Sequence, residues 1–196
     1  SFAPGNYDGL NFKTVRNGTG DPLPDVLAKA GHHWYEMRAD RVAELVIPLA
    51  YGKRLYVGRV NPAAFVNQRL MGMNAHANVN VDLAHALLNC TIGLLMIEGI
   101  GFGRGLGALD LNKDRIEANL HMLDPEKLTK IQQNEIITAF KAVKKRKILE
   151  VSDELDQSDR QNLDDIIIRN FEINVSRETI YDSLRALVEV RHAIEF

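Results

Sequence analysis

The chain has 196 residues, of which 45% are hydrophobic and 26% are charged, and its formal net charge is −2. This composition is that of an ordinary globular protein and excludes a disordered chain. A protein built only to coat nucleic acid is usually more basic, although a local basic patch would still allow contact with DNA.

The first part of the chain is predicted to be rich in β-strands. The pattern permits a short strand at residues 12–16, ahead of a turn-forming stretch of Asn, Gly, Asp and Pro. Apolar and alternating residues predict strands at 44–49 and 54–60, and the turn residues 51–53 between them indicate a hairpin. Residues 64–73 are a third candidate strand.

The central segment has the pattern of a buried helix followed by a glycine-rich loop. Residues 83–98 are apolar almost all round, which is typical of a helix inside the core. Residues 99–107 have glycine at every second position and are predicted to form a loop. A short strand is expected at 108–112.

The last part of the chain is predicted to be helical. The sequence Asp-Pro-Glu at 124–126 is a strong start signal, with Asp as the cap and Pro in the first turn. Helices are therefore expected at 125–129 and 132–150. Ser158 begins a sequence that fits a capping box, and Ser176 is expected to cap the last helix.

These elements predict an α+β fold in two parts. Residues 1–123 would form a β-rich domain around the buried helix, and residues 124–196 a helical C-terminal tail. The apolar run 83–97 is too short to span a bilayer comfortably, and the chain shows no signal peptide or transit sequence. The single cysteine, Cys90, is expected to be a buried small hydrophobe, and the chain is expected to be soluble and cytoplasmic.

Two short motifs invite a catalytic interpretation. A phosphate-binding loop follows a strand and opens a helix, whereas residues 99–107 follow a helix and lead into a strand. The loop is better interpreted as backbone that passes close to another group, with Arg104 in reach of a phosphate or a base edge. Residues 61–65 partly resemble the Asn/Asp-Pro-Pro-aromatic motif of amino-group DNA methyltransferases, but the second proline is missing, which favours a turn at the end of a strand.

Other signals for a functional site are weaker still. The six histidines lack the spacing of a metal set, and no Gly-x-Ser-x-Gly sequence supports a Ser-His-Asp hydrolase. The dense basic cluster comprises Lys141, Lys144, Lys145, Arg146 and Lys147. Such a helix either contacts DNA phosphates or forms a solvated face, whose charge the acidic run 150–156 balances.

Three segments near the centre of the chain carry a resemblance to a known family. They are Ala-Leu-Leu-Asn-Cys at 86–90, Glu98-Gly99, and Gly-Leu-Gly-Ala-Leu-Asp-Leu at 105–111. In this order they resemble the LLNS helix, the Gly-rich loop and the GALxL strand in the C-terminal part of bacterial N6-adenine DNA methyltransferases, including those of restriction–modification systems. Cys90 stands where Ser is usual in that family.

The resemblance extends to both sides of these segments. Upstream, Trp34-Tyr35, Leu45-Val46-Ile47-Pro48, Arg54 and Asn61 are similar to the family's strand pairs. Downstream, Arg160, Leu163-Asp164, Ile180-Tyr181 and Leu187-Val188-x-x-Arg191 are similar to its helical tail. The tail is more acidic than is usual in the family.

The resemblance implies a specific function. In these enzymes the N-terminal half binds S-adenosylmethionine and carries the catalytic motif, and the C-terminal half reads the DNA target. The chain looks like the second half alone, with no catalytic residue and no cofactor of its own, while its parent enzyme would use S-adenosylmethionine. The partners so implied are double-stranded DNA, the methyltransferase domain of the same parent protein and a restriction or specificity subunit, with no membrane.

The candidate DNA contacts are polar or basic residues of the predicted strands, loops and basic helix. They are Lys53, Arg54, Asn67, Gln68, Arg69, Arg104, Lys144 and Lys145. Such side chains read base edges, and the basic ones hold phosphates. The alternative function is a protein-interaction module whose tail 158–196 docks a partner subunit of a restriction–modification complex. A small hydrolase that uses Ser, His and Asp is a third alternative.

Overall fold

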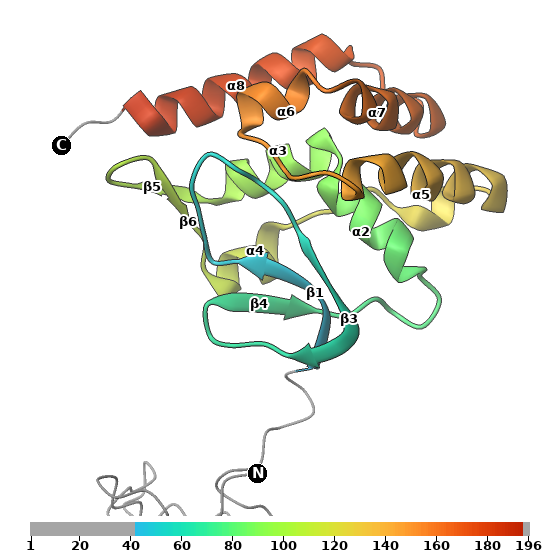
Figure 1. Cartoon of the computed structure of the whole chain (residues 1–196), viewed down its shortest axis with the longest axis horizontal. Coiled ribbons are helices and arrows are strands. Elements are labelled where there is room, and N and C mark those ends of the chain that lie inside the picture. Colours follow the sequence, from blue (N-terminus) through green and yellow to red (C-terminus); the bar gives the residue numbers. More distant parts are fainter. Residues whose placement is uncertain (1–41, 194–196) are drawn as a thin grey trace, which may run out of the picture. The chain divides into compact units, whose positions relative to one another are not determined.

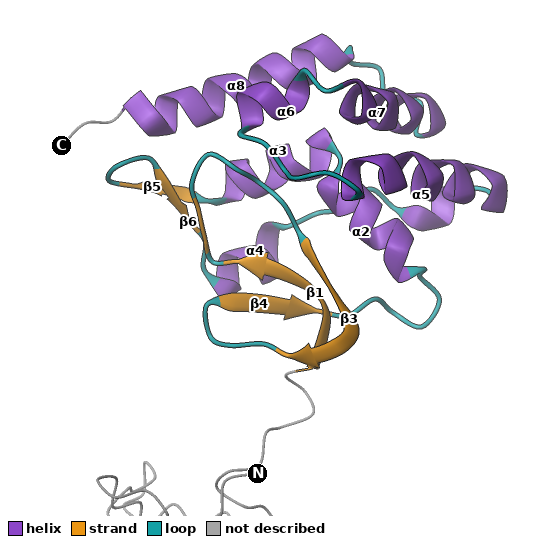
Figure 2. Cartoon of the chain, viewed as in Figure 1, coloured by secondary structure: helices purple, strands orange, loops and turns teal. Residues whose placement is uncertain are grey.

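The computed structural model of the chain describes residues 42–193, and the strand permitted at 12–16 lies outside them. Within the described residues, antiparallel strands and helices occur together, which confirms the predicted α+β class (Figures 1 and 2). The strands come mainly before the helices in the chain, as predicted, and the described residues after β6 form helices and loops without a strand.

The first sheet is built from β1 (Val42–Pro48), β3 (Gly58–Phe65) and β4 (Leu70–Met73), in the order β3-β1-β4. Both neighbours of β1 run antiparallel to it. Alternate residues of β1 are buried, as the period of two in a half-buried strand requires. The predicted antiparallel pairing is confirmed where Leu45 pairs with Arg59 and Val46 with Gly58, but residues 54–57 of the second predicted strand lie in no strand.

The predicted tight turn at 51–53 is wrong. Between β1 and β3 the chain enters a second sheet, where β2 (Ala50–Tyr51) pairs with β6 (Ala108–Asp110), and β6 pairs with β5 (Phe102–Arg104). The connection from β1 to β3 is long because β2 leaves the first sheet to pair with β6 in the second. The predicted glycine-rich loop at 99–107 accordingly contains a strand, β5.

The expected turn at residues 61–65 is also wrong, because these residues lie within β3, where all five are exposed. The third candidate strand, 64–73, is shorter than expected. Residues 67–69 form the turn after β3, in which the backbone N–H of Leu70 donates to the carbonyl of Asn67 at 3.1 Å.

The single buried helix expected at 83–98 is wrong in one respect. It is two helices, α2 (Val81–Asn89) and α3 (Thr91–Ile100), which meet at Cys90 with a bend of 68°. Among the described residues no single helix is long and apolar enough to cross a membrane, although this bent pair passes by length and composition.

Polar contacts of three consecutive residues produce the break. Cys90 is the N-cap of α3, and its sulfur accepts from the backbone N–H of Gly93 at 3.5 Å. Asn89 turns its side-chain amide to Val57, accepting from the backbone N–H at 2.9 Å and donating to the carbonyl at 3.0 Å. Thr91 donates its backbone N–H to the carboxylate of Asp164 at 2.9 Å. Because Asp164 and the Cys90 sulfur satisfy the N–H groups of Thr91 and Gly93 at the start of α3, the chain can change direction there.

The C-terminal part comprises α4 (Lys113–Asn119), a 3₁₀ turn (Pro125–Lys127), α5 (Lys130–Lys144), α6 (Val151–Leu155), α7 (Ser158–Asn170) and α8 (Arg177–Ala193). Asp124 and Ser176 cap their helices as predicted, each with a side-chain oxygen that accepts a backbone N–H. The capping box predicted at Ser158 is wrong, because α7 already starts at Ser158 and its cap, Gln157, makes no side-chain cap bond.

Two hydrophobic clusters form the core. One joins the strands with α3, α6 and α8, and the other joins α2 with α5 and α7. Described residues on both sides of position 124 contribute to both clusters, and the division into residues 1–123 and 124–196 stays a prediction. The helices cover one side of the strands in Figure 2.

Candidate nucleic-acid interface

The small sheet brings three predicted DNA-contacting residues to one end. In its register Tyr51 lies beside Leu109, and Arg104 lies beside Ala108 on the other side of β6. Continuing the register by one residue places Gly52 beside Ala108, so Gly52 and Arg104 lie two strand spacings apart, roughly 10 Å. Lys53 and Arg54 follow Gly52 directly. Two segments that are 50 residues apart in the sequence thus leave the sheet together (Figure 1).

Arg191 of α8 contacts both the segment that follows β2 and the β5–β6 turn. Its guanidinium forms an ion pair with Glu98 of α3, at 2.7 Å from Nε to Oε1. It also donates to the backbone carbonyls of Gly107 in the β5–β6 turn and of Gly52, the latter at 3.1 Å. The side chains of Arg191 and Glu98 are only 4% and 3% exposed. The planar guanidinium has five donors and reaches both carboxylate oxygens of Glu98 and the two carbonyls at once.

The ring of His192 fills the space beside Gly107. A Cβ added to Gly107 would overlap this ring, and the residue has a φ of 72°, which favours glycine. Burial lowers the pKa of His192, and the positive charges of Arg191 and Lys53 lower it further. The imidazole therefore packs against the turn mainly in its neutral form near neutral pH.

The cations at this end of the sheet are exposed, and their partners can be exchanged. Arg104 contacts Asp110 at 3.0 Å with 74% of its side chain exposed, and Lys53 lies 3.6 Å from Glu150. Arg54 is exposed and makes no ion pair with another residue in the range 42–193. Exposed pairs of this kind are worth about 0–1 kcal/mol, so an incoming phosphate can replace the carboxylates at little cost.

A pocket of about 230 Å³ lies beside Lys53, between the segment that follows β2 and helices α6 and α8. Its lining includes Lys53, Glu150, Arg185, Glu189 and His192. The mixed charges of these side chains favour neither an anion nor a cation, so the pocket by itself indicates no ligand.

Asn67, Gln68 and Arg69 lie elsewhere, in the turn between β3 and β4. All three residues are exposed. The side-chain oxygen of Asn67 accepts from the backbone N–H of Arg69 at 2.8 Å, so Asn67 is partly used to shape the turn. Gln68 and Arg69 make no side-chain hydrogen bond or ion pair with another described residue.

Lys144 and Lys145 lie at the C-terminal end of α5. Both residues are exposed, and Lys144 contacts Asp82 of α2 at 3.8 Å and lies 6.0 Å from the centre of the Phe140 ring. Arg146, which the sequence groups with them, points inward and contacts the carboxylates of Glu154 and Asp159. The structure thus separates the eight predicted residues into three groups: the end of the small sheet, the β3–β4 turn and the end of α5.

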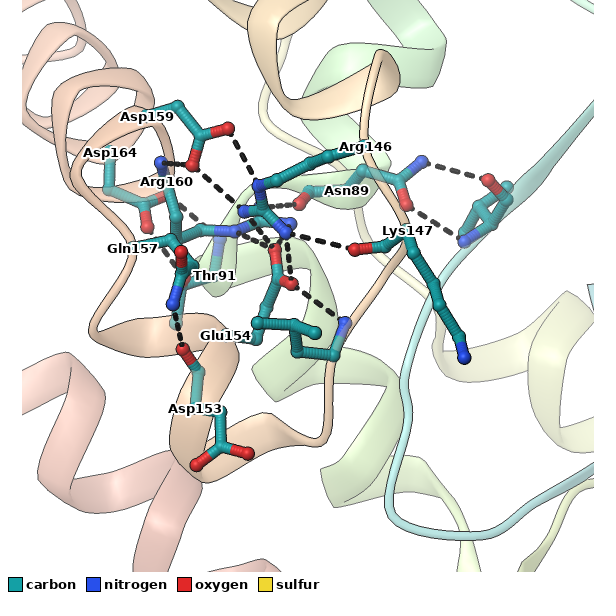
Figure 3. A network of polar contacts seen from close by, with 12 residues as sticks. Asn89, Thr91, Arg146, Lys147, Asp153, Glu154, Gln157, Asp159, Arg160 and Asp164 are labelled. Carbon is teal, nitrogen blue, oxygen red and sulfur yellow. Dashed lines mark hydrogen bonds and ion pairs between the residues drawn. The ribbon is translucent and has the colours of Figure 1, made fainter.

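The downstream residues of the resemblance take part in buried polar networks that the sequence did not predict. In Figure 3, Arg160 of α7 and Arg146 both point toward Glu154 of α6. Arg160 also donates to the backbone carbonyl of Asn89, where α2 ends. Arg160 is 1% exposed and Glu154 is 2% exposed.

A second buried contact joins α7 and α8 to the start of α3. Asp164 accepts from the hydroxyls of Thr91 at 2.6 Å and Tyr181 at 2.8 Å. Burial raises the pKa of Asp164, against the lowering effects of Arg160 and of these hydrogen bonds. Its oxygens are fully engaged inside the protein, so Asp164 is a structural residue.

Cys90, at the break between α2 and α3, is the N-cap of α3, a position at which Ser, Thr, Asp and Asn are the favoured residues. Across the residues that the structure describes, no group of three or more His, Cys, Asp or Glu side chains could hold a metal ion. Comparison of the chain with protein-family models, curated proteins and solved structures found no match.

Proposed function

We propose that this chain is the target-recognition region of an adenine-specific DNA methyltransferase or restriction–modification enzyme. One observation carries the proposal. The residues that resemble the family's separate motifs contact one another in the folded chain: Arg160 contacts Asn89, Asp164 contacts the residue after Cys90, and Arg191 contacts Glu98. The residues that carry the resemblance therefore form one connected set in the fold instead of lying at scattered positions.

The proposed division of labour follows from where polar side chains are buried and where they are exposed. The motif residues act as scaffold, and the exposed cations Lys53, Arg54 and Arg104 approach the DNA phosphates and base edges from the end of the small sheet. The β3–β4 turn and the end of α5 would provide further contacts. S-adenosylmethionine and the catalytic residues would belong to the methyltransferase domain of the parent protein, which would act in the cytoplasm.

The test is a salt series of DNA binding, measured by fluorescence anisotropy with short duplexes of random sequence. We expect the wild-type chain to bind with an affinity that falls as salt rises, because each phosphate contact releases counterions. In the variant Lys53→Gln/Arg54→Gln/Arg104→Gln, the slope of log affinity against log salt is expected to flatten by about 0.9 for each phosphate that the variant no longer neutralises.

The matched control is Lys127→Gln/Lys130→Gln/Arg169→Gln, which removes the same charge from other exposed positions. Its slope is expected to stay at the wild-type value. Equal slopes for all three proteins would exclude the end of the small sheet as the interface. Absence of any salt-dependent binding by the wild-type chain would contradict the proposed function itself.

A second candidate function, a protein-interaction module, is favoured by the surface of α8. Leu187 and Val190 are 43% and 63% exposed and lie about one helical turn apart, so they form a small apolar surface on α8. If α8 docks a restriction or specificity subunit, Leu187→Ser/Val190→Ser is expected to abolish co-purification of that subunit without changing the thermal midpoint of the chain. Undiminished co-purification would exclude this surface.

A further inference from the structure

The tip of the β5–β6 hairpin presents an isolated apolar side chain. Leu106 is 100% exposed and stands between Gly105 and Gly107 at the turn. It makes no contribution to either hydrophobic cluster. Its large apolar surface therefore gives the described fold no stabilisation from burial.

The backbone at Leu106 is strained. Its φ is 65°, in the left-handed region, where a residue with a Cβ costs roughly 1–2 kcal/mol relative to the right-handed conformation. Glycine would adopt this conformation without that cost, and glycine is present on both sides. A strained, fully exposed leucine is a feature that stability does not explain, and such outliers cluster at binding sites.

The hairpin beneath the tip is well supported. Three residue pairs join β5 to β6, and Arg191 donates to the carbonyl of Gly107. At the base of β5, the guanidinium of Arg115 lies 5.3 Å from the centre of the Phe102 ring. A side chain on such a base can press against a macromolecule while the hairpin keeps its shape.

The charges around the tip favour DNA as the macromolecule. Arg104 lies two residues before Leu106, and Lys53 and Arg54 leave the sheet at the same end. Proteins that kink or open DNA combine an apolar side chain inserted between base pairs with cations on the flanking phosphates. An apolar tip flanked by basic residues fits this combination, whereas a pocket on a protein would use the cations only if carboxylates lined its rim.

We propose that Leu106 is a wedge that enters the base stack of bound duplex DNA and locally unstacks it. This inference rests on the proposed function and deepens it. An adenine must leave the stack before its amino group can be methylated, and the cost of unpairing and unstacking it is a few kcal/mol. A wedge beside the target would bear part of that cost during binding.

The test uses DNA topology, because local unstacking untwists the duplex whatever its sequence. A nicked plasmid is ligated in the presence of the wild-type chain, and the linking number of the purified product is measured on a gel. We expect a shift that grows with the amount of bound protein. Leu106→Gly is expected to lose the shift and to bind linear duplexes within about threefold of wild type, because wedge contacts and unstacking largely offset one another.

Leu106→Gly also removes the backbone strain, so it is expected to unfold at the same temperature as the wild type or higher. Leu106→Met keeps an apolar side chain and is expected to keep the shift. An undiminished shift with Leu106→Gly would overturn the wedge while leaving DNA recognition in place, as would wild-type binding without any shift. Absence of wild-type binding would overturn both proposals. Loss of a protein partner with Leu106→Gly, at an unchanged linking number, would assign the tip to a protein contact instead.

Discussion

Replacing Glu154 with methionine is expected to lower the free energy of unfolding of the chain by about 3–5 kcal/mol. Glu154 is the carboxylate that Arg146 and Arg160 share, at 2.7 Å and 2.9 Å. Arg146 would keep Asp159, but the side chain of Arg160 would keep no hydrogen-bonded carboxylate among the described residues. A fully buried guanidinium that loses its hydrogen-bonded carboxylate is strongly destabilising, even though Asp164 keeps a negative charge in its neighbourhood. Urea unfolding at neutral pH measures the loss.

A double-variant cycle separates the effect of the buried charge from the effect of altered packing. In Glu154→Met/Arg160→Met both buried charges are gone, so this protein is expected to be more stable than Glu154→Met alone. The control is Asp156→Asn, which removes an exposed partner of Arg185 and is expected to cost less than about 1 kcal/mol. If Glu154→Met/Arg160→Met were less stable than Glu154→Met alone, the buried charge of Arg160 would not be the cause of the destabilisation by Glu154→Met.

The same network gives a pH dependence with a definite sign. Burial raises the pKa of Glu154, but hydrogen bonds and charges from Arg146 and Arg160 outweigh it and hold the pKa below its usual value. A lowered pKa in the folded state means that the stabilisation is present above the unfolded value, about 4.3, and is lost as the pH falls below it. The stability difference between wild type and Glu154→Met should therefore shrink in acid.

The sequence predicted correctly the features that depend on interactions between neighbouring residues. The alternation in β1 and the caps at Asp124 and Ser176 depend on residues within one element, and these predictions are confirmed. The break at Cys90 was missed because an apolar run gives no sign that Asn89 and Thr91 will bind distant partners, Val57 and Asp164. The pairing of β2 with β6 was missed for the same reason.

The buried charges did leave a signal in the sequence. Arg191 lies seven residues after Leu184, and Arg160 lies seven before Ile167, so each arginine falls on the apolar stripe of its own helix. A charged residue on such a stripe is buried only if it is paired, which predicts a partner without identifying it. The location of Lys53, Arg54 and Arg104 at one end of the small sheet gave no such signal. It depends on sheet register between segments far apart in the chain.

Replacing Arg191 with methionine is expected to have the second large effect, about 3–5 kcal/mol, because Glu98 would remain buried without its counter-charge. Unlike the change at Glu154, it also removes the hydrogen bonds to the carbonyls of Gly107 and Gly52. Amide hydrogen exchange should therefore quicken most in residues 52–57 and in the β5–β6 hairpin. Arg185→Met, on the same helix and paired with the exposed Asp156, is the control and is expected to cost less than about 1 kcal/mol.

The variant Arg191→Met/Glu98→Leu tests whether Arg191 affects DNA affinity separately from its effect on the stability of the fold. With both buried charges removed, much of the stability should return, whereas the two carbonyls remain without their donor. If Arg191 positions the proposed interface, DNA affinity should stay below the wild-type value in this double variant even under conditions where it is fully folded. Recovery of affinity together with stability would show that Arg191 supports the fold alone, and the alignment of the two segments at the end of the small sheet would then depend on the β2–β6 and β5–β6 pairings.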